Sequence, residues 1–290
     1  MSTALALAVS SSLCFGIALV TGRIGLRTLD ARSGASISIP TATVLFALAS
    51  PFAFDAGGFT ILAALVFAAV GLFFPALVTI LTFRSNEQLG PTITGAVSGT
   101  APLFALLAAG LLLGEKVPAQ AAAACLAIVA GVAVLSWKQD AVRPGFLGWS
   151  LLWPIAGAVV RGLAQAGAKA GLALWPSPFS ASLIGYSVSS AVAIGANQVG
   201  RSKRPKLTRH GVLWFALTGV LNGGAVLLMY GALSIAPVSL VAPIVATYPL
   251  VTVLVSAVVL REEPVTPRMV AGAIITVLAI VYLVASRTGG

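Results

Sequence analysis

The sequence predicts an all-α integral membrane protein with ten transmembrane helices, arranged as two inverted five-helix repeats. Composition is the first reason: of 290 residues 59% are hydrophobic and 8% are charged, and the mean hydropathy is +1.05. An average soluble domain has about 25% charged residues. Several apolar stretches also reach about 20 residues, the length that a helix needs to cross ~30 Å of hydrocarbon. A set of motifs that occurs twice supplies the third reason.

Short polar or Pro- and Gly-containing breaks separate the apolar stretches, and they leave no room for a soluble domain. The predicted helices span residues 3–29, 34–53, 59–84, 91–113, 119–137, 146–172, 178–199, 211–234, 238–260 and 267–286. The first of them is predicted to stay as a membrane helix. A cleaved signal peptide would have basic residues before its apolar run, whereas here Arg23 and Arg27 follow it.

The net charge of +10 would suggest a nucleic-acid partner in a soluble protein. Here the basic residues lie mainly in loops and at helix ends, as topology signals do, so no nucleic acid is expected. Cys14 and Cys125 fall in apolar helices, where a thiol behaves as a small hydrophobe. The single histidine, His210, lies in a basic loop without a metal-ligand cluster, phosphate loop or nucleophile–base pair around it. We therefore expect no enzyme, no cofactor and no metal site.

The repeat consists of glycines, prolines, basic residues and a glutamate that recur in the same order. The pairs Phe15/Arg161, Gly16/Gly162, Arg23/Lys169 and Pro91/Pro237 are offset by 146 positions, and Thr100/Thr247, Pro102/Pro249 and Glu115/Glu262 by 147. The chain thus divides into halves at residues 1–140 and 141–290. Because each half has an odd number of helices, the halves must enter the membrane in opposite orientations. That arrangement is typical of secondary transporters, whose substrate site lies near the midplane between the halves.

At these residues the chain resembles the EamA branch of the drug/metabolite transporter (DMT) superfamily, whose carriers contain two EamA repeats. In that family each repeat opens with an aromatic-Gly pair and a basic residue seven positions later. An Ala-Pro helix start, a Thr-x-Pro motif and a Gly-Glu pair follow. The resemblance covers nearly the whole chain and implies ten helices and solute transport. Arg161 departs from the pattern, since it replaces the expected aromatic residue.

Arg161, Gln165 and Lys169 form one polar stripe on the helix predicted at residues 146–172, because they are spaced i, i+4, i+8. An arginine at membrane depth costs roughly 2.5 to 3.5 kcal/mol on insertion scales, so it needs a partner, a water-filled cavity or a ligand. If Arg161 faces the cavity between the halves, its planar guanidinium can hold a carboxylate or phosphate. Alternatively it ends near the headgroups or pairs with backbone carbonyls, and Lys169 can snorkel to the interface.

Further candidates for substrate binding are Tyr248, Tyr230 and Asn222, three of the polar groups predicted at membrane depth. For Asn222 the alternative is hydrogen bonding between helices, since Gly219 and Gly223 permit close packing there.

Glu87 is a candidate charge partner, either for Arg84 three residues earlier or for Arg161 across the bundle. The alternative for Glu87 and Arg84, a solvated pair in a loop, is the simpler interpretation. The seven carboxylates all fall outside the centres of the predicted helices. Small multidrug exporters of the superfamily that the chain resembles bind cationic drugs through a glutamate in their first helix, so the resemblance implies that this chain does not export cationic drugs in that way.

Four repeated residues are assigned to geometry and gating. Pro102 and Pro249 fall inside predicted helices, where each removes a hydrogen bond and kinks the axis. Glu115 and Glu262 follow their helices, a position that the helix dipole disfavours. We expect these glutamates to bond the backbone at the start of the next helix.

Two arguments about orientation disagree. Members of the family commonly have both termini in the cytoplasm, which would place 13 Lys and Arg residues outside and 3 inside, with Arg161 set aside. The positive-inside rule predicts the reverse, with both termini outside the cytoplasm.

The leading hypothesis is a secondary transporter of small polar metabolites, carboxylate-bearing or amino-acid-like, in the cell (inner) membrane. The alternatives are export of amphipathic or cationic compounds, and a non-transporting membrane or lipid-handling partner. The expected partners are a small-molecule solute and the lipid bilayer, and a homodimer is left open. Substrate, direction and coupling ion do not follow from the sequence.

Overall fold

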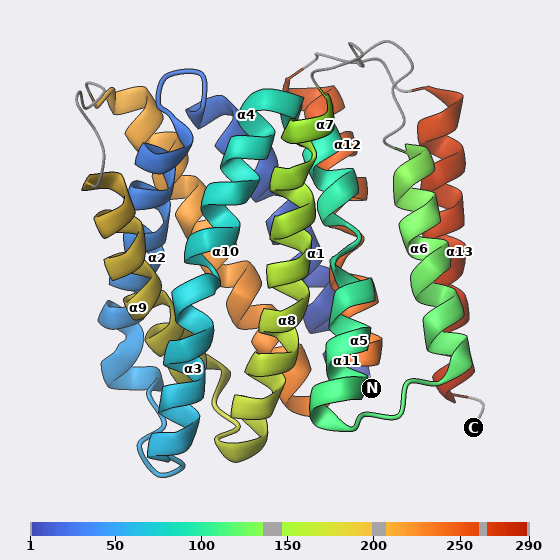
Figure 1. Cartoon of the computed structure of the whole chain (residues 1–290), viewed down its shortest axis with the longest axis horizontal. Helices are drawn as coiled ribbons and strands as arrows, with labels where there is room; N and C mark the ends of the chain where they lie inside the picture. The colour runs from blue at the N-terminus through green and yellow to red at the C-terminus, as the bar shows by residue number, and fades with distance from the viewer. Residues whose placement is uncertain (1, 136–146, 199–206, 261–265, 289–290) are drawn as a thin grey trace.

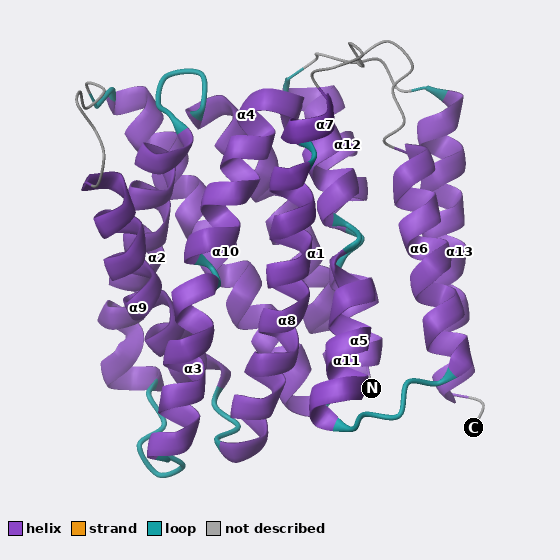
Figure 2. Ribbon diagram, viewed as in Figure 1, coloured by secondary structure: helices purple, strands orange, loops and turns teal. Residues whose placement is uncertain are grey.

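The computed structural model describes residues 2–135, 147–198, 207–260 and 266–288, and every regular element in these ranges is a helix (Figure 1, Figure 2). The first half contributes α1 (Ser2–Gly25), α2 (Ala31–Ala53), α3 (Ile61–Phe73), α4 (Ala76–Ser98), α5 (Ala101–Leu113) and α6 (Ala119–Leu135). The second half contributes α7 (Leu147–Ser150), α8 (Leu152–Leu174), α9 (Pro178–Gln198), α10 (Arg209–Ile235), α11 (Val238–Val245), α12 (Tyr248–Val259) and α13 (Pro267–Thr288).

The two halves interleave, because the main packing partner of most helices comes from the other half. α1 packs along α10, α2 along α9, and α4 and α5 along α8. α6 and α13 form a pair beside the rest of the bundle (Figure 1). The interface between the halves is therefore the core of the molecule, and a site built there draws on both repeats.

Seven helical segments in the described ranges are long and apolar enough to cross a membrane. One of them, Ile61–Leu113, has 53 residues, far more than the about 20 that one crossing needs. It reverses direction within α4 at Gly90, whose φ of 80° lies in the left-handed region that favours glycine. α5 then runs back alongside the bundle (Figure 1). This segment thus contains two of the helices that the sequence predicts.

The outer surface is apolar while polar side chains turn inward. Phe52, Leu111 and Leu48 are among the most exposed side chains, at 93%, 83% and 69%. Ser11 and Thr21 of α1 are buried and bond α10, through Ala225 O and Thr218 Oγ1. An apolar exterior with interhelical hydrogen bonds inside is the arrangement that a multi-pass membrane protein requires.

The two Thr-x-Pro motifs give helix breaks, and this corrects the expected kinks. Pro102 and Pro249 lie in the first turn of α5 and α12, immediately after short turns that end α4 and α11. Proline is tolerated in a first turn because its missing N–H would have had no partner there. Each repeat therefore contains a discontinuous membrane-spanning helix that is interrupted at about half its length: α5 continues the last part of α4, and α12 continues α11.

Candidate functional site

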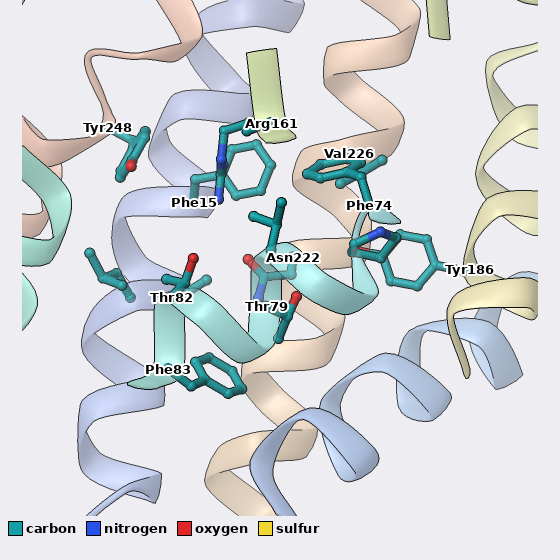
Figure 3. Close-up of a pocket in the computed structure, with 14 residues that line it drawn as sticks. Phe15, Phe74, Thr79, Thr82, Phe83, Arg161, Tyr186, Asn222, Val226 and Tyr248 are labelled. Carbon is teal, nitrogen blue, oxygen red and sulfur yellow. The ribbon is translucent and has the colours of Figure 1, made fainter. Parts of the chain in front are cut away.

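A small cavity lies between the halves, at the midpoints of several helices (Figure 3). Its walls come from α1, the α3–α4 junction, α8, α9, α10 and α12: Phe15, Ala18, Leu19, Phe74, Pro75, Val78, Thr79, Thr82, Phe83, Arg161, Tyr186, Asn222, Val226 and Tyr248. Its volume of about 30 Å³ suits one or two water molecules. The walls must therefore separate before an organic solute can enter.

Arg161 is the only charged residue among these lining residues. It is 8% exposed, and its guanidinium carbon lies 5.0 Å from the ring centre of Phe15, 5.6 Å from that of Tyr248 and 5.9 Å from that of Phe74. The faces of aromatic rings stabilise a desolvated cation by about 2 kcal/mol. The three rings thus hold the guanidinium at the cavity.

The rings leave the Nε of Arg161 without a hydrogen bond among the described residues. No carboxylate lies among the lining residues. Within the described part of the chain, Arg161 forms no ion pair. An uncompensated buried charge is costly, so the arrangement favours an anion that arrives from outside the protein.

Polar neutral groups occupy one side of the guanidinium. Thr79 and Thr82 project from α4 and Asn222 from α10, all below Arg161 in Figure 3. Tyr186 adds a buried hydroxyl without a hydrogen-bond partner. The sequence did not single out Thr82, although its i+3 spacing from Thr79 puts both on one helix face.

A second feature lies toward the end of the bundle where α1 begins and α13 ends (Figure 1). A groove of about 560 Å³ is lined there by Glu115, Lys169 and the junction of α10 and α11. Lys169 Nζ donates to the carbonyls of Leu233 at 2.6 Å and Ala236 at 3.0 Å, at the C-terminal end of α10. A cation at that end is favoured by the helix dipole.

Glu115 completes this junction from the other half. Its carboxylate accepts hydrogen bonds from the backbone N–H groups of Val238 and Ser239, both at 3.0 Å, and from the Ser239 hydroxyl. The carboxylate thus caps the N-terminus of α11. Glu115 does bond the start of a helix, but of α11 in the second half and not of the next helix, α6.

Comparison with known proteins decides the family. The sequence profile of the EamA-like transporter family matches residues 2–137 and 148–285, nearly the whole chain in two repeats. The chain belongs to this family. No curated protein matches it, but 29 chains of solved structures do. One of these, titled only "Crystal structure of protein", has a TM-score of 0.80 at 15% identity and is covered completely by this chain, as this chain is by it. That likeness concerns the fold.

Equivalent glycines of the two EamA repeats allow the same close helix packing in both halves. A Cβ on Gly16 would lie 2.5 Å from Val251 Cβ and 2.8 Å from Tyr248 O, on α12. A Cβ on Gly162 would lie 2.6 Å from Phe104 Cβ, on α5. The first helix of each repeat therefore packs directly on the discontinuous helix of the other repeat. Phe15 and Arg161, one position earlier, meet each other at the cavity.

The basic residues of the two EamA repeats are equivalent as well. Arg23 donates to the carbonyls of Asn86 at 2.8 Å and Glu87 at 3.4 Å, which end the first part of α4. Glu87 is the repeat equivalent of Leu233, whose carbonyl accepts from Lys169. Because the repeats are inverted, the Arg23 contact lies at one end of the bundle and the Lys169 contact at the other.

The remaining predicted residues are placed away from the cavity. Gln165 and Tyr230 are buried at 3% exposure but do not line it, and Gln165 Oε1 lacks a hydrogen-bond partner. Lys169 contacts the α10 end instead, since the stripe on α8 runs from the cavity to the groove.

The predicted charge partners of Arg161 are not brought to it. Glu87 is exposed, so it does not face the buried guanidinium. Arg84 forms no ion pair with the described Glu87, and its guanidinium carbon lies 5.8 Å from the ring centre of Trp153. Glu262 lies outside the described residues.

Proposed function

We propose that this protein is a secondary transporter of small polar solutes that carry a carboxylate, the class that also includes amino-acid-like solutes. The observation that carries the proposal is Arg161, a buried cation at a cavity between inverted repeats that has no counter-charge among the described residues. A guanidinium binds a carboxylate through two parallel hydrogen bonds, which would use the N–H groups that the rings leave free. Tyr248 and Asn222 complete the proposed site.

Alternating access fits the two equivalent contacts made by Arg23 and Lys169, one toward each end of the helix bundle. The Arg23 contact joins α1 to α4, and the Lys169 contact joins α8 to α10. Each holds a helix end of its own repeat, at opposite ends of the bundle. Breaking one while the other persists would open the cavity to one side only, as transport between two compartments requires.

The proposed topology has ten crossings of the cell membrane in two domains, residues 1–140 and 141–290. The discontinuous stretches count as single crossings: α3 with the first part of α4, the last part of α4 with α5, α7 with α8, and α11 with α12. α1 begins and α13 ends at the same end of the bundle, as an even number of crossings demands (Figure 1). A homodimer and the orientation stay predictions.

Export of cationic compounds is the competing function. The aromatic rings of the cavity would suit a cation, but their faces already hold Arg161. A second cation there would be repelled by the guanidinium. The rings therefore support the anion rather than the cation.

Flux into proteoliposomes that contain only this protein tests the proposal. A panel of labelled monocarboxylates, amino acids and lipophilic cations would be offered to the wild type and to Arg161→Met, with melting curves to show that both are folded. We expect carboxylate flux in the wild type and none in the variant. Equal flux in both proteins, or flux of lipophilic cations alone, would reject the assignment.

A further inference from the structure

We propose that the solute is a net anion, a small monocarboxylate with a neutral oxo or hydroxyl group next to its carboxylate. The cavity would select against the amino acid of the same size and shape. This inference rests on the proposed function and narrows its substrate class. Three observations carry it: the charge balance of the cavity, the state of the nearby carbonyls, and the neutral groups opposite Arg161.

The charge balance is the first. A zwitterionic amino acid brings an ammonium within a few ångströms of its carboxylate, and hence close to Arg161. No lining residue is acidic, so nothing in the cavity would offset that second positive charge. At short range in a poorly solvated site two like charges repel strongly. The carboxylate alone, by contrast, neutralises the guanidinium.

Backbone carbonyls at a helix break could take the place of an acidic side chain, because the C-terminal end of a helix favours cations. At the α11 break two of these carbonyls already accept hydrogen bonds from the protein. Ile244 O accepts from both the N–H and the hydroxyl of Thr247, and Ala242 O accepts from Ala246 N–H. A solute ammonium would find these carbonyls occupied.

The α3 break is closed in the same way. Val70 O accepts from Phe74 N–H, and Gly71 O accepts from the Ser189 hydroxyl. At each break that borders the cavity, two carbonyls near the helix end are thus already paired, which leaves fewer acceptors for a solute ammonium. The hydroxyl and amide oxygens of the lining could accept from an ammonium but would not neutralise its charge, and the ring faces surround Arg161 itself.

The groups opposite Arg161 suit a neutral oxygen. The hydroxyls of Thr79 and Thr82 and the amide of Asn222 can donate to an oxo group or exchange hydrogen bonds with a hydroxyl. A second carboxylate in their place would have no cation, since Arg161 is the only charged lining residue. The geometry therefore points to one negative charge and one neutral oxygen.

Matched pairs of probes test the inference on the full detergent-purified chain. Pyruvate is compared with alanine, and phenylpyruvate with phenylalanine, by the rise in melting temperature at increasing concentration. We expect the oxo acids to stabilise the wild type at about tenfold lower concentration, because a buried donor without an acceptor typically costs about that factor. Arg161→Met should respond to none of the four probes. Asn222→Asp places a carboxylate in the cavity and should shift the preference toward the amino acids.

The outcomes separate the two levels of the argument. If the amino acids stabilise the wild type as well as the oxo acids do, and Arg161→Met abolishes both responses, carboxylate transport stands and the selection of net anions is wrong. If no probe stabilises the wild type, or if folded Arg161→Met and Arg161→Lys respond as the wild type does, both proposals are wrong.

Discussion

The two repeats make equivalent helix-packing contacts, but they place different side chains at the cavity. Gly16 and Gly162 allow the same close approach to a discontinuous helix, and Arg23 and Lys169 bond equivalent helix ends. At the cavity, however, Phe15 faces its equivalent Arg161. The matched residues thus make equivalent packing contacts and hydrogen bonds in both repeats, and the mismatched residues lie at the cavity where we propose that the solute binds.

Tyr248 follows the same rule. Its equivalent in the first half is Ala101, which is buried at 1% exposure and lies outside the cavity lining. The second repeat therefore supplies both the cation and one of the rings around it. A symmetric pair of halves would have given two equal binding positions, whereas this pair gives one charged position.

Adding a methyl group at the matched glycines should disrupt the packing between the repeats and produce the largest decrease in the free energy of unfolding. Gly16→Ala and Gly162→Ala each force a Cβ against backbone atoms of a neighbouring helix, which should cost about 3 kcal/mol or more, the upper end for overpacking. Gly224→Ala is the matched control, since its Cβ would meet nothing within 4 Å. Melting temperatures should fall for the first two variants and hold for the control. A uniform response of all three would contradict the shared packing.

Glu115 tests the contact that ties one half to the other. Glu115→Ala removes three hydrogen bonds to the start of α11, and about 1.5 to 3 kcal/mol of stability should be lost. Glu115→Gln, which keeps an acceptor without the charge, should lose less. Glu87→Gln serves as the control because this side chain is exposed. Equal melting temperatures for Glu115→Ala and the control would refute the cap.

Substitutions of the equivalent basic residues Arg23 and Lys169 should have smaller effects, and they should open the cavity from opposite sides of the membrane. Val226→Cys, in a background without Cys14 and Cys125, provides a buried thiol in the cavity wall. Lys169→Met should increase its labelling by an impermeant reagent from the side of the termini, and Arg23→Met from the opposite side. Loss of about 1 kcal/mol of hydrogen bonding corresponds to about a fivefold change. If labelling increased from the same side in both variants, the two contacts would not close opposite ends of the cavity.

The fold class was predictable because membrane helices are recognised from the length and hydropathy of apolar stretches. The paired motifs in turn show where the second repeat begins. The all-helical fold and the two EamA repeats are confirmed. The break before Pro102 and Pro249 was expected as a kink, since the sequence does not show whether a helix bends or stops at a proline.

The site was predictable only in part. Arg161 stood out because a lone arginine at membrane depth is costly. Its neighbours Phe74 and Thr82 did not, because aromatic and hydroxyl residues are ordinary in membrane helices and their direction depends on packing between distant segments. The same limit applies to Lys169, whose spacing from Arg161 shows a shared helix face but not which part of that face the cavity reaches.

The melting temperature of Arg161→Met, measured without and with pyruvate, tests the central claim most directly. If Arg161 is kept for a ligand, the variant loses an uncompensated buried charge and should melt no lower than the wild type without pyruvate. Pyruvate should then raise the melting temperature of the wild type only. A variant that melts several degrees lower, with the pyruvate response intact, would show that Arg161 serves the fold and does not bind the solute.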